Sequence, residues 1–161
     1  MKEEDLHKII SHILEECRMV LPGIQALFGF QLIAIFNARF WEGLDSTARL
    51  VHLVAVLLVA LSVALVMTPA AYHRQALRHG ISRFFVDFAS TCVLLSMIPL
   101  LLGIVAGFYL IANMILADSR LAFGLSLLLF LVYTGLWFVL PRILTASRHA
   151  GQLQRVKQNI C

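Results

Sequence analysis

Residues 50–71 read LVHLVAVLLVALSVALVMTPAA, and this stretch decides the fold. It contains no Asp, Glu, Lys or Arg, and it is long enough to cross the roughly 30 Å hydrocarbon core of a bilayer as one helix. Its apolar residues cover every face of a helix, so it lacks the alternation that a membrane β-strand requires. The stretch is therefore predicted to be a transmembrane helix.

Three further charge-free runs have the same character, namely Met19–Phe36, Phe88–Leu116 and Leu121–Leu140. Four membrane spans are predicted from them, at about 19–37, 50–71, 88–116 and 121–141. The last two runs are only a few residues apart, so we expect an antiparallel helical hairpin there. The whole chain, residues 1–161, is predicted to form one membrane domain. Its fold class is all-α, an integral membrane four-helix bundle.

The composition of the chain excludes other classes of protein. Of its 161 residues, 60% are hydrophobic and 14% are charged, and the mean hydropathy is +0.87. A soluble domain is typically about 45–50% apolar and about 25% charged. A soluble globular domain, a disordered chain and a disulfide scaffold are therefore excluded. The net charge of +4 comes from basic residues at the ends of the spans, so no nucleic-acid partner is expected.

The basic residues predict the orientation of the chain. Ten of the thirteen Lys and Arg lie in the N-terminal tail, in the loop between the second and third runs, or in the tail 142–161. Four spans place these segments on one side, and basic segments are retained in the cytoplasm. Both termini are thus predicted to be cytoplasmic, in a bacterial inner membrane, with anionic inner-leaflet lipids as partners. Aromatic residues expected at this interface are Tyr72, Phe84, Phe85 and Trp137.

Residues 1–18 are predicted to hold an amphipathic helix. Their apolar residues recur at spacings of three and four: Leu6, Ile9, Ile10, Ile13, Leu14 and Cys17. We expect this helix to lie on the membrane surface or to pack under the bundle. A short coiled-coil arm is the alternative.

The predicted topology brings polar residues together at the cytoplasmic ends of the spans. They are Glu15, Glu16, Arg18, His73, Arg74, Arg83 and Asp87. We expect Glu16 to pair with Arg74, because Arg–carboxylate pairs are geometrically specific and fix helix register. His73 is a candidate pH sensor. The alternative, which we favour, is an ordinary interfacial cluster of ion pairs that holds the helices at the headgroups.

Inside the predicted spans, amides, glycines and one proline stand out. The intramembrane polar residues are Gln25, Gln31 and Asn37, and the candidate hinge or packing residues are Pro99, Gly103 and Gly107. Gln25 and Gln31 lie about 240° apart around a helix. This spacing favours bonding between helices over a polar path. Pro99 should kink its helix, and the G-x-x-x-G that follows permits close packing, which we favour over a gating hinge.

Catalytic and metal-binding patterns are missing. The sequence has no H-E-x-x-H, G-x-S-x-G or Walker motif, and the serines in the spans have no titratable neighbour there. No two histidines have the i, i+4 spacing of a metal site, and the three cysteines form no close pair. No catalytic residue, metal or cofactor is therefore expected.

Two segments, EECRMVLPGIQALFGFQL at 15–32 and TPAAYHR at 68–74, resemble a functionally uncharacterised family of small bacterial four-span membrane proteins. The resemblance implies that the recurrent positions of the family are Arg18, Pro22, Gln25, Gly29, Pro69, His73 and Arg74. Some members carry the label of a sodium–proton antiporter. That label fits poorly, because such carriers usually need a carboxylate at depth and these spans contain none.

Three functional hypotheses follow. The favoured one is a non-enzymatic membrane protein that acts through helix packing and assembly, as a scaffold or accessory subunit. The alternative is a homo-oligomeric channel or transporter for an ion or solute, gated near Pro99, Gly103 and the amides of the first span. The third is a membrane enzyme that uses the His–Arg–Glu cluster on lipid headgroups.

Overall fold

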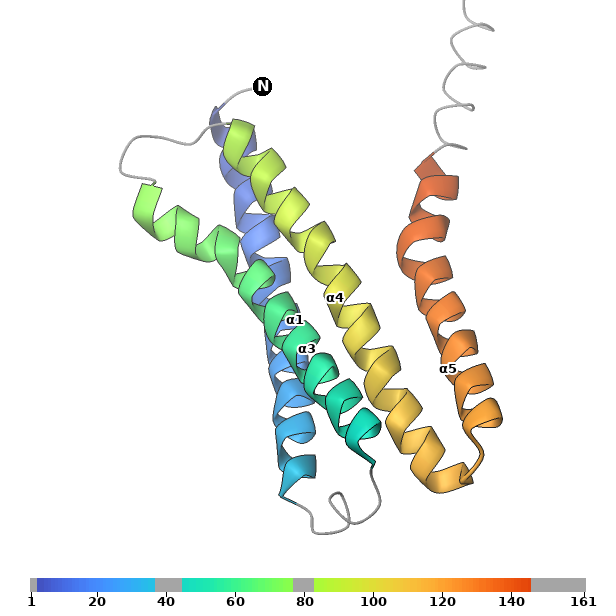
Figure 1. Cartoon of the computed structure of the whole chain (residues 1–161). Coiled ribbons are helices and arrows are strands. Elements are labelled where there is room, and N and C mark those ends of the chain that lie inside the picture. The colour runs from blue at the N-terminus through green and yellow to red at the C-terminus, as the bar shows by residue number, and fades with distance from the viewer. Residues whose placement is uncertain (1–2, 37–44, 77–82, 146–161) are drawn as a thin grey trace, which may run out of the picture.

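The computed structural model describes residues 3–36, 45–76 and 83–145, and it describes the side chains of all of these except 3–7, 76 and 83. This part of the chain contains four long helices and one π-helical segment: α1 (Glu3–Ile35), α3 (Ser46–Ala76), α4 (Arg83–Leu116), α5 (Ser119–Thr134) and η2 (Gly135–Val139). Successive helices run in opposite directions, so the start of α1 and the end of the fourth helix lie at the same end of the molecule (Figure 1). The all-α prediction is therefore confirmed for the described residues.

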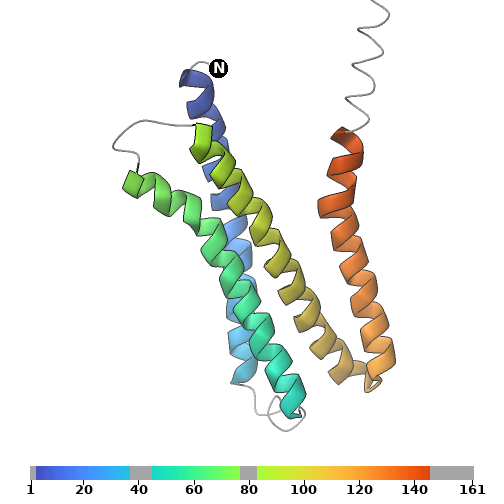
Figure 2. The same ribbon diagram turned by 45° about the horizontal axis from the view of Figure 1, so that its top comes forward.

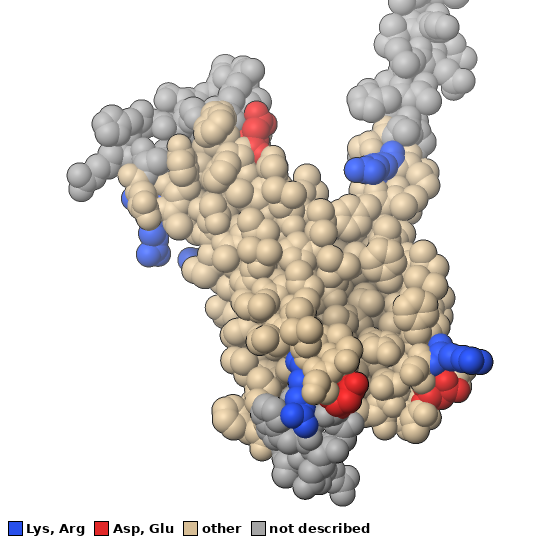
Figure 3. Space-filling view, in the orientation of Figure 1, with Lys and Arg blue, Asp and Glu red and all other residues tan. Residues whose placement is uncertain are grey.

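All four helices are long and apolar enough to cross a membrane. The segments with this property are Lys8–Ile35, Ser46–Gln75, Phe84–Leu116 and Ser119–Thr145. In the face shown in Figure 3, charged side chains lie toward the two ends of the molecule, and a broad uncharged band separates them. This is the distribution that a hydrocarbon layer imposes, because charge is costly at its centre.

Two aspartates cap the starts of α3 and α5. Asp45 Oδ1 accepts a hydrogen bond from the backbone N–H of Ala48 at 2.9 Å, and Asp118 Oδ1 accepts one from Arg120 N–H at 2.8 Å. Only Ala117 and Asp118 separate α4 from α5, and Ala117 turns the chain with a φ of 51°. The predicted antiparallel hairpin of the last two helices is therefore confirmed (Figure 1).

The core lies where α1, α3 and α4 meet. One cluster of buried residues spans these three helices, and its members are Cys17, Ile24, Val59, Val66 and Leu100. The fourth helix packs beside α4 and leans away from α1 and α3 in both views (Figures 1 and 2). In the most apolar stretch of α3, and likewise of α4, 33% of the residues are buried inside the chain. The corresponding share is 6% for the first and for the fourth helix. The expected bundle is thus a three-helix core with α5 on its flank.

The first helix differs from the expectation of a separate amphipathic segment. Helix α1 is continuous from Glu3 to Ile35, and Pro22 lies inside it. Proline removes one backbone hydrogen bond and does not terminate α1 here. Near its N-terminus, α1 packs through the buried Ile10 against Phe85 and Ala89 of α4. The amphipathic face is therefore docked on another helix of the same chain.

The interior prolines of α3 and α4 have different effects. Helix α3 bends in its last third, where Pro69 is fully buried (Figure 1). Helix α4 continues through the buried Pro99 as one helix, and its course in Figure 1 is far straighter. The bend predicted at Pro99 is therefore much weaker than the bend near Pro69, where the missing N–H removes a hydrogen bond of α3.

The fourth helix widens into a π-helix that the sequence analysis did not predict. Within Gly135–Val139 the helix takes more residues per turn, and the N–H of Leu140 donates to the carbonyl of Gly135. Trp137, in this segment, packs against the three-helix core. Its ring meets the ring of Tyr133 edge to face, with 4.8 Å between the ring centroids. Trp137 therefore helps to attach the fourth helix to the core.

The contact between α3 and α4 at Gly103 predicts a loss of stability on adding one methyl group. A Cβ at Gly103 would lie 2.7 Å from Val59 Cγ2 and 3.1 Å from the carbonyl oxygen of Ala55. We expect Gly103→Ala to lower the free energy of unfolding in detergent micelles by about 1–2 kcal/mol, because overpacking outweighs the better helix propensity of alanine.

Gly124→Ala is the matched control, since a Cβ at Gly124 meets no atom within 4 Å. This variant is expected to gain about 0.5–1 kcal/mol from helix propensity alone. Equal stabilisation by both substitutions would contradict the close approach of α3 and α4.

Candidate functional site: a groove between α1 and α3

A groove of about 510 Å³ lies between α1 and α3, toward the end of the molecule that holds the N-terminus. Its polar lining comes from Glu15 and Arg18 of α1 and from His73 and Arg74 of α3. Its apolar lining comes from Leu14, Leu21, Val66, Met67 and Ala70, among others. One groove thus joins charged side chains to an apolar floor, and we call it the α1–α3 groove.

The polar residues expected to cluster at this end of the molecule do not all lie in the groove. Four of its seven members line the α1–α3 groove, as given above. Glu16 and Asp87 are exposed and do not line it, and the side chain of Arg83 lies outside the described part of the chain. Glu15 and Arg18 share a face because they are three residues apart, whereas Glu16 is turned by about 100° from Glu15.

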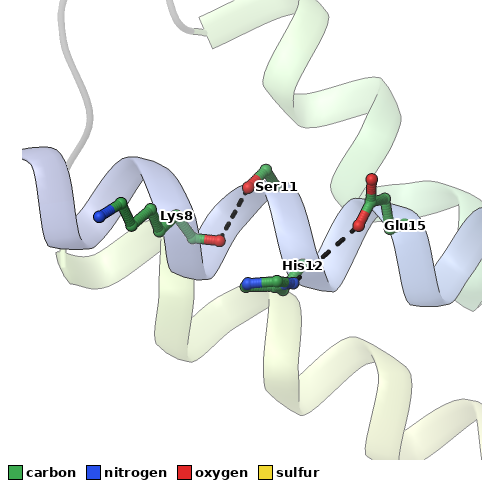
Figure 4. Close-up of polar contacts among 4 residues, drawn as sticks. All are labelled: Lys8, Ser11, His12 and Glu15. Atoms are coloured by element: carbon green, nitrogen blue, oxygen red, sulfur yellow. Dashed lines mark hydrogen bonds and ion pairs between the residues drawn. The ribbon is translucent and has the colours of Figure 1, made fainter.

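The expected pair between Glu16 and Arg74 is not formed. Among the described side chains, neither Arg18 nor Arg74 has an ion-pair partner. Glu15 instead meets His12 on the outer surface of α1, with 3.9 Å between His12 Nδ1 and Glu15 Oε2 (Figure 4). Both of these side chains are more than 70% exposed, at 77% and 71%, so this pair contributes little. The groove lining therefore carries two arginines against one carboxylate, Glu15, and neither arginine forms an ion pair with a described side chain.

Aromatic packing sets the position of His73 at the rim of the groove. The ring of His73 lies 5.9 Å from the ring of Phe85, which in turn stacks on Tyr72 at 5.6 Å. Phe85 is only 3% exposed and belongs to one buried cluster with Ile10 of α1. Phe85 therefore joins α1, α3 and α4 at one end of the core.

A second polar contact lies at the other end of the same helices. His52 of α3 is 7% exposed, and its Nε2 lies 3.1 Å from the backbone carbonyl oxygen of Gln31 in α1. The carbonyl accepts, so Nε2 donates this hydrogen bond. The side-chain amide of Gln31 lies against α4, with its nitrogen 3.3 Å from the position of a Cβ on Gly107. Gln31 Oε1 is buried without a hydrogen-bond partner among the described residues.

Sequence reasoning did not single out His52 as an interior polar residue, although a histidine inside a charge-free run was a signal for it.

The remaining intramembrane candidates have different environments. Gln25 is exposed on the surface of α1, and Asn37 lies outside the described residues. Pro99 and Gly103 are buried in α4, where Gly103 faces α3. Gly103 therefore serves packing between helices of the same chain.

Metal-ligating groups do not gather in the described part of the chain. No group of three or more His, Cys, Asp and Glu side chains there is close enough to hold an ion. Cys17 and Cys92 are buried free thiols, and Cys161 lies outside the described residues. A second groove, of about 470 Å³ between α3, α4 and α5, is lined almost entirely by apolar side chains. The α1–α3 groove is accordingly the better candidate site for a polar ligand.

Comparison with known proteins gives a family but no function. The family described as "Family of unknown function (DUF6328)" matches residues 1–141. No curated protein and no solved structure matches the chain.

The His52–Gln31 contact predicts that two histidines of this chain differ strongly in their effect on stability. We expect His52→Ala to lower the free energy of unfolding by about 2 kcal/mol, because it removes a buried side chain and a hydrogen bond between helices. His12→Ala, which truncates a 77% exposed side chain, should change it by less than about 0.5 kcal/mol.

His52→Phe separates the hydrogen bond from the packing. It keeps an aromatic ring in place and removes the donor, so a loss of about 1 kcal/mol is expected. Denaturant titration in micelles measures all three variants. Wild-type stability of both His52 variants would show that the contact with Gln31 contributes nothing.

Proposed function

This chain belongs to the DUF6328 family of unknown function, and we propose that it is a non-enzymatic, multi-pass inner-membrane protein that acts by assembly with further copies of itself. In this role it serves as a scaffold or accessory subunit. The observation that carries the proposal is an exposed amide, Gln25, in the middle of a segment apolar enough to span the membrane.

The proposed orientation has both termini in the cytoplasm. It is supported by the excess of Lys and Arg in the three segments at one end, ten residues against three. The antiparallel course of the helices brings the beginning of α1 and the end of the fourth helix to that end (Figure 2). A bacterial inner membrane is the compartment that this orientation fits.

The amide of Gln25 needs a partner that the chain itself does not provide. Its side chain is exposed, and it makes no hydrogen bond to any described residue. Hydrocarbon offers no donor or acceptor, so an amide there is stabilised only by another polar group. The same amide on a second copy supplies one, because two glutamines donate to and accept from each other.

The surface of α1 around Gln25 suits close approach of another helix. Gln25, Gly29 and Leu32 follow one face at spacings of four and three, and each is exposed or half-exposed. A Cβ added at Gly23 or Gly29 would meet no atom within 4 Å. Small residues at such positions let helix backbones come close together in membranes. We therefore place the contact between copies on this face of α1.

Catalysis has less support than assembly. His73 is the base available in the α1–α3 groove, but no described hydroxyl or thiol lies within hydrogen-bond distance of it. Ser11, which also lines the groove, donates its hydroxyl to the backbone carbonyl of Lys8 at 2.8 Å (Figure 4). A nucleophile and its base need such a contact.

One observation favours the alternative function, a homo-oligomeric channel or transporter. His52 and Gln31 place a titratable ring and an amide inside the apolar segments. Buried polar groups of this kind mark ion or proton paths in other membrane proteins. We rank this function second, because the described spans contain no carboxylate near His52.

Assembly through Gln25 predicts a change in particle mass. In detergent and in nanodiscs, the protein mass of the wild-type particle is expected to be at least twice the 18.0 kDa of one chain. Gln25→Leu should shift the particle mass toward that of a single chain. Gln75→Leu, the same replacement at an exposed residue at the end of α3, should leave it unchanged. A single-chain wild type would contradict assembly, and an unaltered Gln25→Leu assembly would contradict the role of the amide.

Ion flux separates the two candidate functions. Liposomes containing the protein, placed under Na⁺, K⁺ and H⁺ gradients, are expected to leak no faster than empty liposomes. Flux above that level in the wild type, lost in His52→Ala and retained in His12→Ala, would replace assembly by the channel or transporter.

A further inference from the structure

We propose that the α1–α3 groove binds one anionic phospholipid, with its phosphate between Arg18 and Arg74 and an acyl chain along the apolar floor. The inference rests on the proposed insertion into a membrane. It does not depend on assembly of several copies, because every lining residue belongs to one chain.

Charge is the first argument for an anionic ligand. Arg18 and Arg74 face one groove from two helices, and neither has an ion-pair partner among the described side chains. Glu15 is the one carboxylate among the described lining residues, so the two arginines outnumber the acidic groups there and the lining keeps a net positive charge. Guanidinium groups bind phosphate oxygens through paired hydrogen bonds, so the two arginines match one phosphate group.

The second argument is the order of polar and apolar groups along the groove. Arg18 and Arg74 stand at the ends of charge-free runs, at the depth where headgroups lie. Leu21 lies about one turn deeper than Arg18, and Val66 lies about 12 Å deeper than Arg74 along the helix axis. The lining therefore changes from cationic to apolar in the same direction as a phospholipid changes from phosphate to acyl chain.

Size and position support a lipid over a free anion. A volume of about 510 Å³ is in the range of small-molecule sites, which is about 300–1,000 Å³, and far exceeds what a phosphate ion alone needs. The floor offers a phosphate ion nothing, whereas Leu21, Val66 and Met67 offer an acyl chain apolar contacts. The basic residues of this end also suit the anionic leaflet.

The test measures lipid binding to the full-length protein in an uncharged detergent. Phosphatidylglycerol, phosphatidylcholine and inorganic phosphate are added separately, and binding is followed by native mass spectrometry and by the shift in melting temperature. We expect phosphatidylglycerol to bind one molecule per chain and to raise the melting temperature. Phosphatidylcholine should require at least about tenfold higher concentrations, and inorganic phosphate should have no effect.

Substitutions locate the site. Arg18→Gln and Arg74→Gln should each weaken phosphatidylglycerol binding by about tenfold, the loss expected for one charge-assisted contact. Both side chains are exposed, so the lipid-free melting temperature should stay unchanged. Ala70→Phe, which fills the floor and keeps both arginines, should also weaken binding. Arg142→Gln, at an exposed arginine on the fourth helix outside the groove, is the control and should bind like the wild type.

Several outcomes would overturn the proposal. Equal binding of phosphatidylcholine would exclude recognition of charge, and an equal effect of inorganic phosphate would reduce the site to an anion site. Equal weakening by Arg142→Gln and Arg74→Gln would indicate a diffuse basic surface instead of the groove. Mass spectrometry counts lipids per chain, so a single-chain protein that still binds phosphatidylglycerol would contradict assembly and leave this inference intact.

Discussion

The close contact between α3 and α4 holds the other helices in place. At Gly103 the two backbones approach so nearly that even a methyl group lacks space, with Val59 and Ala55 on the opposite side. Helix α1 packs on both members of this pair. The fourth helix is joined to α4 by the short turn at Ala117 and packs on the three-helix core through Trp137. Helix packing of this kind needs small residues, because hydrocarbon does not drive helices together as water does.

A three-helix core with a flanking fourth helix leaves much apolar surface outside the chain. The first and fourth helices keep most of their span surface exposed, which lipid covers without penalty. The exposed Gln25 differs from this apolar surface, because an amide in hydrocarbon is stabilised only by a polar partner. The interior amide, Gln31, is in a different position, beside His52 and Gly107. Two similar residues six positions apart in α1 thus face different surroundings.

The α1–α3 groove owes its chemistry to the same architecture. The continuous α1 carries Glu15 and Arg18 past the end of the apolar run, and the bent end of α3 carries His73 and Arg74 to the same level. Phe85 fixes this end by packing between Ile10 and Tyr72. A packed aromatic cluster therefore supports a groove that has cationic groups at its rim and apolar side chains along its floor.

The sequence by itself determined the number of helices, their apolar character and the location of charge at their ends, because hydrocarbon excludes charged side chains from four long runs. It also determined the α4–α5 hairpin, since so short a link permits no other course. Only the tertiary structure decided which faces meet. A helix that is apolar all round has no periodicity to mark its buried side, so the contact of His52 with Gln31 and the burial of Phe85 were not predictable. The unbroken α1 and the π-helix at Gly135–Val139 were likewise not predicted, because local sequence does not show how helices pack on one another.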